Sequence, residues 1–187
     1  MILLNQMKKI FQQKNKGFTL VETLVAISIF TMSILALLSI LTQGISNTNY
    51  AKTKMTGLYL AQEGIEYIRN MRDTYVLYTE MTGNDWNKFK VKLNLCSPGN
   101  ECGIDNLFLS TDPSFIFKCS SGAGGCKLYL DNGNYNAIVG NESGFVRKIW
   151  MTTITANEVK VFSSVSWNQG SGAYNITLSE DLFNWVE

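Results

Sequence analysis

The sequence predicts an α+β protein in which a long N-terminal helix, half transmembrane and half amphipathic, packs against a C-terminal antiparallel β-sheet. Three observations predict this class. Residues 18–41 are almost wholly apolar, residues 45–73 keep a helical spacing of apolar positions, and residues 145–179 hold three β-rich segments separated by turns. A length of 187 residues allows one modest domain plus an appendage.

The composition excludes several classes of function. The chain has no histidine, which removes His-dependent nucleophilic catalysis, His-ligated metals and an imidazole proton shuttle. No nucleophile–base motif stands out either, so we expect no enzymatic activity, no catalytic residues, no metal site and no cofactor. The formal charge of +1, from 16 basic and 15 acidic residues, argues against a nucleic-acid partner.

Residues 18–41 are long enough to cross a membrane. At about 1.5 Å per residue they reach roughly 36 Å, against about 30 Å for a hydrocarbon core. Four lysines and no acid precede them, so 12 basic residues remain against 15 acidic ones, a net charge of −3 for the rest of the chain. The positive-inside rule then predicts a single-pass protein of the cytoplasmic membrane, with its N-terminus in the cytoplasm and everything after Gln43 outside.

A simple anchor and a secretory signal both account for an apolar segment, but the apolar region of a signal is usually only about 7–15 residues long. Neither accounts for Glu22, the one charged residue of the segment. A carboxylate inside an apolar helix costs a few kcal/mol unless it is neutralised or paired. Glu22 is therefore a candidate functional residue with a partner to be named.

The sequence KGFTLVE at residues 16–22, followed by a long apolar helix, resembles the cleavage and methylation segment of type IV prepilins and type II secretion pseudopilins. The resemblance implies that prepilin peptidase removes residues 1–17 as a leader by cutting after Gly17 and that Phe18 is then N-methylated. It also implies that Glu22 compensates the new amine of a neighbouring subunit during assembly. Residues 18–43 would form the transmembrane and filament-core half of the helix.

In the same family the remaining residues, 44–187, form an extracytoplasmic pilin-like domain that includes an amphipathic helix, here 44–73. The implied function is that of a structural minor subunit of a type IV pilus or type II secretion pseudopilus. The implied partners are prepilin peptidase, other pilin or pseudopilin subunits, an inner-membrane platform protein and, before assembly, the lipid bilayer.

Two features bear on the subtype. Many major pilins carry a proline where this chain has Ser39, and the last forty or so residues resemble minor pseudopilin I and minor pilin V proteins. Both suit a minor subunit. The alternative is a pilus-tip adhesin or a ligand- or DNA-binding minor pilin, and the choice between a secretion pseudopilus and an adhesion, motility or DNA-uptake pilus stays open.

The amphipathic half of the helix shows apolar residues at spacings of three and four, which predicts the floor of a globular core. The positions are Met55, Leu58, Ala61, Ile65, Ile68 and Met71. Gly57 and Gly64 interrupt this half, and they either weaken the helix or permit close packing.

Residues 87–95 (NKFKVKLNL) alternate apolar and basic side chains, which predicts a half-buried β-strand. The lysines Lys88, Lys90 and Lys92 would form its solvated face, although an acidic partner or DNA is an alternative. The Gly-rich segment 120–125 and the acidic segment 131–136 are predicted to be turns, because they lack the residue pattern of a phosphate loop and of an EF-hand.

Four cysteines lie in the part predicted to be extracytoplasmic, where disulfides persist. Their spacing is wider than that of common zinc sites, so we expect two disulfides over a zinc site or free thiols. Spacing allows three pairings without choosing one, and we favour local closure: Cys96 with Cys102, and Cys119 with Cys126.

The three C-terminal segments 145–154, 158–167 and 173–179 predict an antiparallel meander. Its inward face would carry Val159, Val161 and, after an irregularity, Val165 and Trp167. Large aromatic residues are more often core anchors than exposed binding patches, so we expect this of Trp150, Trp167 and Trp185.

Overall fold

The computed structural model describes residues 17–78, 85–105, 116–119 and 125–184. The chain divides into two compact units, Met1–Asn49 and Tyr50–Glu187. Helix α2, Leu20–Tyr78, contributes residues to both units. Each unit is described by itself below.

In the first unit, α2 is apolar on all sides, and several of its hydroxyl groups bond to its own backbone. Thr23, Ser28 and Thr31 each donate a hydrogen bond to the carbonyl three residues earlier, at 2.8–2.9 Å. Ser33 and Thr42 do so to the carbonyl four residues earlier. These hydroxyls therefore need no water, which suits an apolar surrounding.

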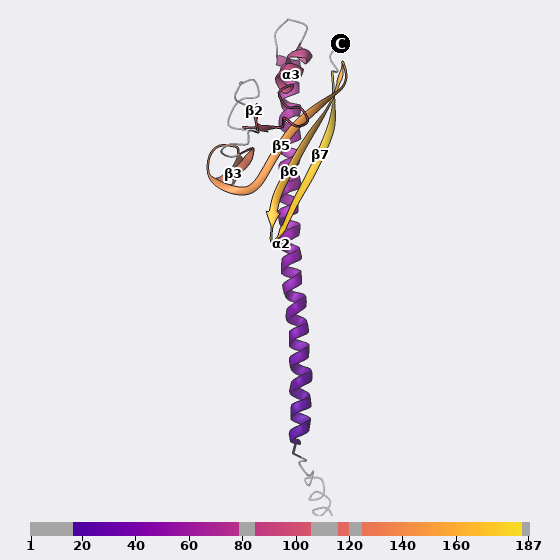
Figure 1. The fold of residues 1–187 in the computed structure, drawn as a ribbon, viewed down its shortest axis with the longest axis vertical. Helices are drawn as coiled ribbons and strands as arrows, with labels where there is room; N and C mark the ends of the chain where they lie inside the picture. The colour runs from indigo at the N-terminus through magenta and orange to yellow at the C-terminus, as the bar shows by residue number, and fades with distance from the viewer. Residues whose placement is uncertain (1–16, 79–84, 106–115, 120–124, 185–187) are drawn as a thin grey trace, which may run out of the picture. The chain divides into compact units, whose positions relative to one another are not determined.

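The second unit contains a seven-stranded sheet and a short helix, α3 (Figure 1). Its long strands β5, β6 and β7 form an antiparallel meander, which confirms the predicted fold class. Strands β1 and β3 both pair with β5, and the short strands β2 and β4 pair with β1 and β3. The bounds are α3 Asp85–Leu93, β1 Cys102–Ile104, β2 Ile116–Lys118, β3 Lys127–Asp131, β4 Asn134–Asn136, β5 Asn141–Thr155, β6 Glu158–Gln169 and β7 Gly172–Phe183.

The core of the second unit lies between α2 and the inner face of the meander. Ile65, Ile68 and Met71 of the helix pack with Val159 and Val161 of β6, so the floor predicted from the helical spacing is confirmed there. Trp167 is also buried, as predicted. Trp150 is only half-buried and stacks on Phe162 of the neighbouring strand, while Trp185 lies outside the described residues.

The inner face of β6 alternates without a break from Val159 to Trp167, so the predicted irregularity is wrong. The middle position is Ser163, which is fully buried. A serine fits there because it faces Gly64 of α2. A methyl group added to Gly64 would come within 2.5 Å of the Ser163 hydroxyl oxygen, so two small residues let helix and strand approach closely.

The predicted stripe is wrong at its N-terminal end. Met55 and Leu58 are exposed, while Gly57 and Leu60 face the sheet. A methyl group on Gly57 would lie 2.9 Å from the Trp167 ring, so the large ring occupies the space that the glycine leaves open. A search for apolar spacing passes over glycine, and here the glycines mark the buried side.

Residues 87–95 are not a strand, and this prediction is also wrong: they belong mainly to helix α3. Trp86, Phe89 and Leu93 are buried, whereas Val91 and Leu95 are exposed. The buried residues are three and four positions apart, which is helical spacing. The apparent alternation arose because lysines happen to separate the apolar residues. Trp86, which directly precedes residue 87, shows that the period of the buried residues is helical.

Buried Arg147 on β5 joins the sheet to α2. Its Nη1 donates hydrogen bonds to the Glu63 carboxylate at 2.6 Å and to the Leu60 carbonyl at 3.3 Å. The guanidinium also lies over the Tyr67 ring, and the Tyr67 hydroxyl donates to Glu63 at 2.9 Å. Its Nε and Nη2 have no hydrogen-bond partner among the described residues, so the arginine is held tightly on one side only.

Candidate processing and assembly site

The Gly17–Phe18 junction is an open, non-helical end of the chain just before α2. Phe18 is 77% exposed. A methyl group added to Gly17 would meet nothing within 4 Å, and Gly17 does not have a positive φ. Neither a close contact nor the backbone conformation therefore requires glycine at position 17. A protease subsite that accepts only a small residue would account for it.

Thr19 caps the start of α2. Its side-chain oxygen accepts a hydrogen bond from the backbone N–H of Glu22 at 3.3 Å, and the helix begins at Leu20. Threonine followed three residues later by glutamate is the spacing of a capping box. The sequence analysis missed this role for Thr19, although the spacing alone would have revealed it.

Glu22 lies in the first turn of α2 with its side chain exposed. A negative charge at this position is favoured by the positive end of the helix dipole, by about 0.3–1 kcal/mol. Because no other acid lies in the apolar half of the helix, the carboxylate is free of repulsion along the helix. A cation close to the N-terminal end of α2 would therefore be attracted to the Glu22 carboxylate.

On both sides of Glu22 the large apolar side chains of the first unit's helix are exposed. The helix is long and apolar enough to cross a membrane. An 18-residue stretch of it has a mean hydropathy of 2.6 and is 0% buried. A helix that is hydrophobic all round requires lipid or other helices around it. The exposed residues include Leu20, Val21, Leu24, Val25, Ile27, Ile29, Phe30, Met32, Leu35, Leu37, Leu38, Ile40, Leu41 and Ile45.

A family model for the prokaryotic N-terminal methylation motif matches residues 12–41. The chain therefore carries a prepilin-type methylation motif at its N-terminal end. No curated protein and no solved structure matches it. The matched motif and the long helix packed on an antiparallel sheet together support the type IV pilin and pseudopilin family.

The match bears on several predictions. The motif implies processing by prepilin peptidase and assembly with pilins, and the apolar helix is consistent with a membrane-anchored prepilin. Members of the pilin family are structural proteins without enzymatic activity, in agreement with the prediction of no catalytic function.

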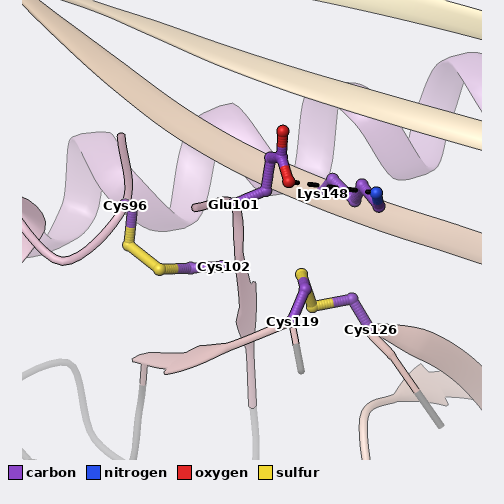
Figure 2. The surroundings of a disulfide bond; sticks show 6 residues. All are labelled: Cys96, Glu101, Cys102, Cys119, Cys126 and Lys148. Atoms are coloured by element: carbon purple, nitrogen blue, oxygen red, sulfur yellow. Dashed lines mark ion pairs between the residues drawn. A yellow bond between two sulfur atoms is a disulfide. The ribbon is translucent and has the colours of Figure 1, made fainter. Parts of the chain in front are cut away.

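The four cysteines form two disulfides, Cys96–Cys102 and Cys119–Cys126, which is the local pairing favoured above (Figure 2). The first joins the end of α3 to β1, and the second joins the end of β2 to the start of β3. The Cys96 carbonyl accepts a hydrogen bond from the Met151 N–H, so this pair is also attached to β5.

The disulfides brace the edge of the sheet where the short strands meet β5. A methyl group on Gly103 would lie 2.9 Å from the Cys126 sulfur, so β1 packs closely on the second disulfide. The ammonium of Lys148 on β5 and the carboxylate of Glu101 lie 3.9 Å apart beside the two disulfides (Figure 2). These contacts give the cysteines a structural role.

The segments predicted to be turns lie next to the second disulfide and strand β3. Asn132 and Gly133, both with positive φ, form the tight β3–β4 turn, so the acidic segment 131–136 is a hairpin. Within the described ranges no group of three or more His, Cys, Asp or Glu residues could hold a metal ion. Most of the Gly-rich segment, residues 120–124, lies outside the described residues.

Lys90 of α3 has a clear structural contact. The Lys90 ammonium donates a hydrogen bond to the Ala156 carbonyl at 2.9 Å and lies 5.8 Å from the centroid of the Trp86 ring. The Trp86 indole N–H donates to the same carbonyl at 2.9 Å. Lys90 thus helps hold α3 on the β5–β6 turn.

Two ion pairs, one half-buried and one exposed, shift the pKa of their basic member. Hydrogen bonding to Glu180, with Glu66 adding to it, raises the pKa of Arg69 and links α2 to β7. A hydrogen bond to Glu142 raises the pKa of Lys127. Both groups keep their charge over the physiological pH range, so neither forms a pH switch.

Proposed function

We propose that the protein is a minor structural subunit of a type IV pilus or a type II secretion pseudopilus. The observation that carries the proposal is that the matched motif, residues 12–41, coincides with a helix that exposes its apolar side chains all round. Such a helix is stable only in lipid or among similar helices, and a filament core supplies the second environment.

Maturation begins at the Gly17–Phe18 bond. Prepilin peptidase hydrolyses this bond on the cytoplasmic side, residues 1–17 leave as the leader, and the new amine of Phe18 is methylated. The exposed junction and the unhindered Gly17 support this step. Thr19 keeps the helix start intact after the leader has gone, because its capping bond involves only residues of the mature chain.

Glu22 supplies the register of assembly. Cleavage creates a positive amine at the edge of a region of low dielectric, where an opposite charge is worth far more than in water. The Glu22 carboxylate of one subunit pairs with the Phe18 amine of its neighbour, and an unpaired carboxylate in this environment is penalised. Subunits that stack out of register lose this pair.

The subtype is that of a minor subunit resembling minor pilin V or minor pseudopilin I. Helix α2 continues without a break through Ser39, where many major pilins have proline. The C-terminal meander ends in the Val-Ser-Trp and Tyr-Asn-Ile-Thr-Leu strands that carry the resemblance.

Before assembly, residues 18–43 span the cytoplasmic membrane with the N-terminus inside, and residues 44–187 lie outside it. The four lysines of residues 1–17, with no acid among them, support this orientation. An inner-membrane platform protein then receives the subunit from the bilayer.

Processing is tested by co-expressing the full chain with a prepilin peptidase and determining the N-terminus by mass spectrometry. The expected product begins with methylated Phe18. The variant Gly17→Val is expected to stay uncleaved, whereas Gly44→Val, an equal change at another open glycine of the first unit, is expected to be processed normally. A wild-type product that keeps Met1 contradicts the proposal.

Assembly is tested with Glu22→Ala and Glu22→Gln. Both variants are expected to be cleaved normally but to enter sheared filaments poorly, since each removes the negative charge. Glu22→Asp, which keeps the charge, is the matched control and should recover part of the incorporation. Wild-type incorporation of Glu22→Ala would rule out the register role.

A further inference from the structure

The start of the second unit carries a group of aromatic and basic side chains that the proposed function does not use. The rings of Tyr50 on α2 and Tyr174 on β7 lie 5.1 Å apart at 57°. The Lys54 ammonium lies 5.9 Å from the centroid of the Tyr50 ring. Tyr174 is 37% exposed and also stacks on Trp167, at 5.9 Å, so the group is attached to the core.

The charges of this region have one sign. Between Ile45 and Gln62 the only charged residues are Lys52 and Lys54, and both are exposed. The neighbouring β6–β7 turn, residues 168–173, contains no charged residue. Two cations and no anion occur here in a segment of an extracytoplasmic part whose net charge is negative.

Along helix α2, Tyr50, Lys52 and Lys54 follow the apolar segment closely. Tyr50 follows Ile45, the last large apolar residue of the exposed series, by five residues of α2, or about 7.5 Å of helix. The headgroup layer on each side of a hydrocarbon core is roughly 5–7 Å thick. When residues 18–43 span the bilayer, Tyr50 therefore falls at the outer edge of the headgroups. Lys52 and Lys54 follow at about 10.5 and 13.5 Å from Ile45, and their long side chains can extend back toward the phosphates.

We propose that Tyr50, Lys52, Lys54 and Tyr174 form a lipid-binding foot that docks the second unit on anionic phospholipid headgroups before the subunit leaves the membrane. Tyrosine is enriched at this depth because its ring is apolar and its hydroxyl is polar, and lysine can extend its charge to the phosphates. The proposal rests on the membrane residence that the proposed function assigns to the unassembled subunit.

The foot holds the second unit in one orientation in the bilayer and is released when the helix enters the filament. The lipid contact is electrostatic, and each lysine near an anionic surface changes the binding equilibrium by about fivefold. Such a contact is strong enough to orient the unit, but it is reversible and weakens as salt is added.

The test uses the full chain, labelled with fluorotryptophan and reconstituted in nanodiscs that carry a nitroxide on the lipid headgroup. Trp167 reports on the foot through its contacts with Tyr174 and Gly57. Trp150 of β5 pairs with Phe162, which lies five residues, or about 17 Å, from Trp167 along β6. Trp86 contacts the β5–β6 turn at the other end of the two strands. Broadening is expected to be largest for Trp167, smaller for Trp150 and smallest for Trp86.

The lysine dependence decides the proposal. In nanodiscs containing phosphatidylglycerol, the double variant Lys52→Gln/Lys54→Gln is expected to lower the docked-to-undocked ratio by about 25-fold, at about fivefold per lysine. The matched control Lys88→Gln/Lys92→Gln removes the same charge from α3 and should leave the ratio unchanged. Pure phosphatidylcholine should reproduce the effect of the first variant.

The outcomes separate this proposal from the proposed function. A chain that does not remain with the nanodiscs contradicts the membrane anchor and, with it, the proposed function. A chain that remains, but whose Trp167 broadening depends neither on Lys52 and Lys54 nor on lipid charge, overturns the foot and leaves the anchor intact. Lysine dependence that appears only on addition of a partner protein also overturns it.

Discussion

The two halves of helix α2 differ in what covers their apolar side chains. From Leu20 to Ile45 the apolar side chains are exposed and depend on lipid or other helices, whereas from Leu60 to Met71 they are covered by the protein's own sheet. In the first half, hydroxyls such as those of Thr23 and Ser28 bond back to the helix and need no other partner. The comparison shows that one continuous helix can serve two surroundings when only its apolar pattern changes.

One glycine from each half of α2 shows the same difference in packing. A methyl group at Gly44 would meet nothing, whereas one at Gly64 would meet Ser163, Arg147 and Ile149 within 3.2 Å. Gly44 is therefore open on the isolated chain. Gly64 is part of a closed interface that the chain itself completes.

The largest effect is expected where the sheet holds the second half of the helix. Arg147→Ala should lower the free energy of unfolding by about 3–5 kcal/mol, because it leaves Glu63 without its buried partner and opens a cavity. Arg147→Met should cost less than Arg147→Ala, since methionine fills most of the space that alanine leaves empty. Chemical denaturation of the detergent-solubilised chain measures both, and equal costs would show that the charge, not the volume, matters.

Loss of a disulfide should rank next. Replacing Cys96 and Cys102 together by serine should cost about 2 kcal/mol, as expected for a closed loop of this length. Because both disulfides lie in the second unit, helicity of residues 20–45 should be unaffected. Circular dichroism and thermal unfolding before and after reduction check this, and a loss of the whole helical signal would contradict the independence of the two halves.

The glycines test the comparison directly. Gly64→Ala should destabilise the second unit by about 1–3 kcal/mol through overpacking, despite the better helix propensity of alanine. Gly44→Ala should leave its unfolding unchanged. Parallel thermal melts measure the pair, and equal effects at both positions would remove the distinction drawn here.

The smallest effect is expected at an exposed ion pair. The raised pKa of Lys127 means that its contribution is complete below the ordinary lysine pKa and is lost only as the pH rises through the raised value. The difference in melting temperature between Lys127→Gln and wild type should therefore be small and constant from about pH 6 to pH 9. A difference that grows within this range would contradict the assignment.

Prediction from sequence succeeded where a pattern is local and long. The long apolar helix, the motif around Gly17 and the three β-rich segments each follow from runs of residues that determine their own environment. It failed at α3, where nine residues fit two periods and Trp86 decides between them through its contacts. It also failed at Met55 and Leu58, because apolar spacing cannot show that glycines face the sheet.

By itself the sequence determined the membrane-length helix, its processing motif, the single acid near its start and the antiparallel meander, since these depend on hydrophobicity and on the nearest neighbours along the chain. Only the tertiary structure decided which face of α2 is buried, that Arg147 bonds to Glu63, and that Ser163 faces Gly64. These depend on side-chain volumes meeting across residues distant in the chain, which no local pattern encodes.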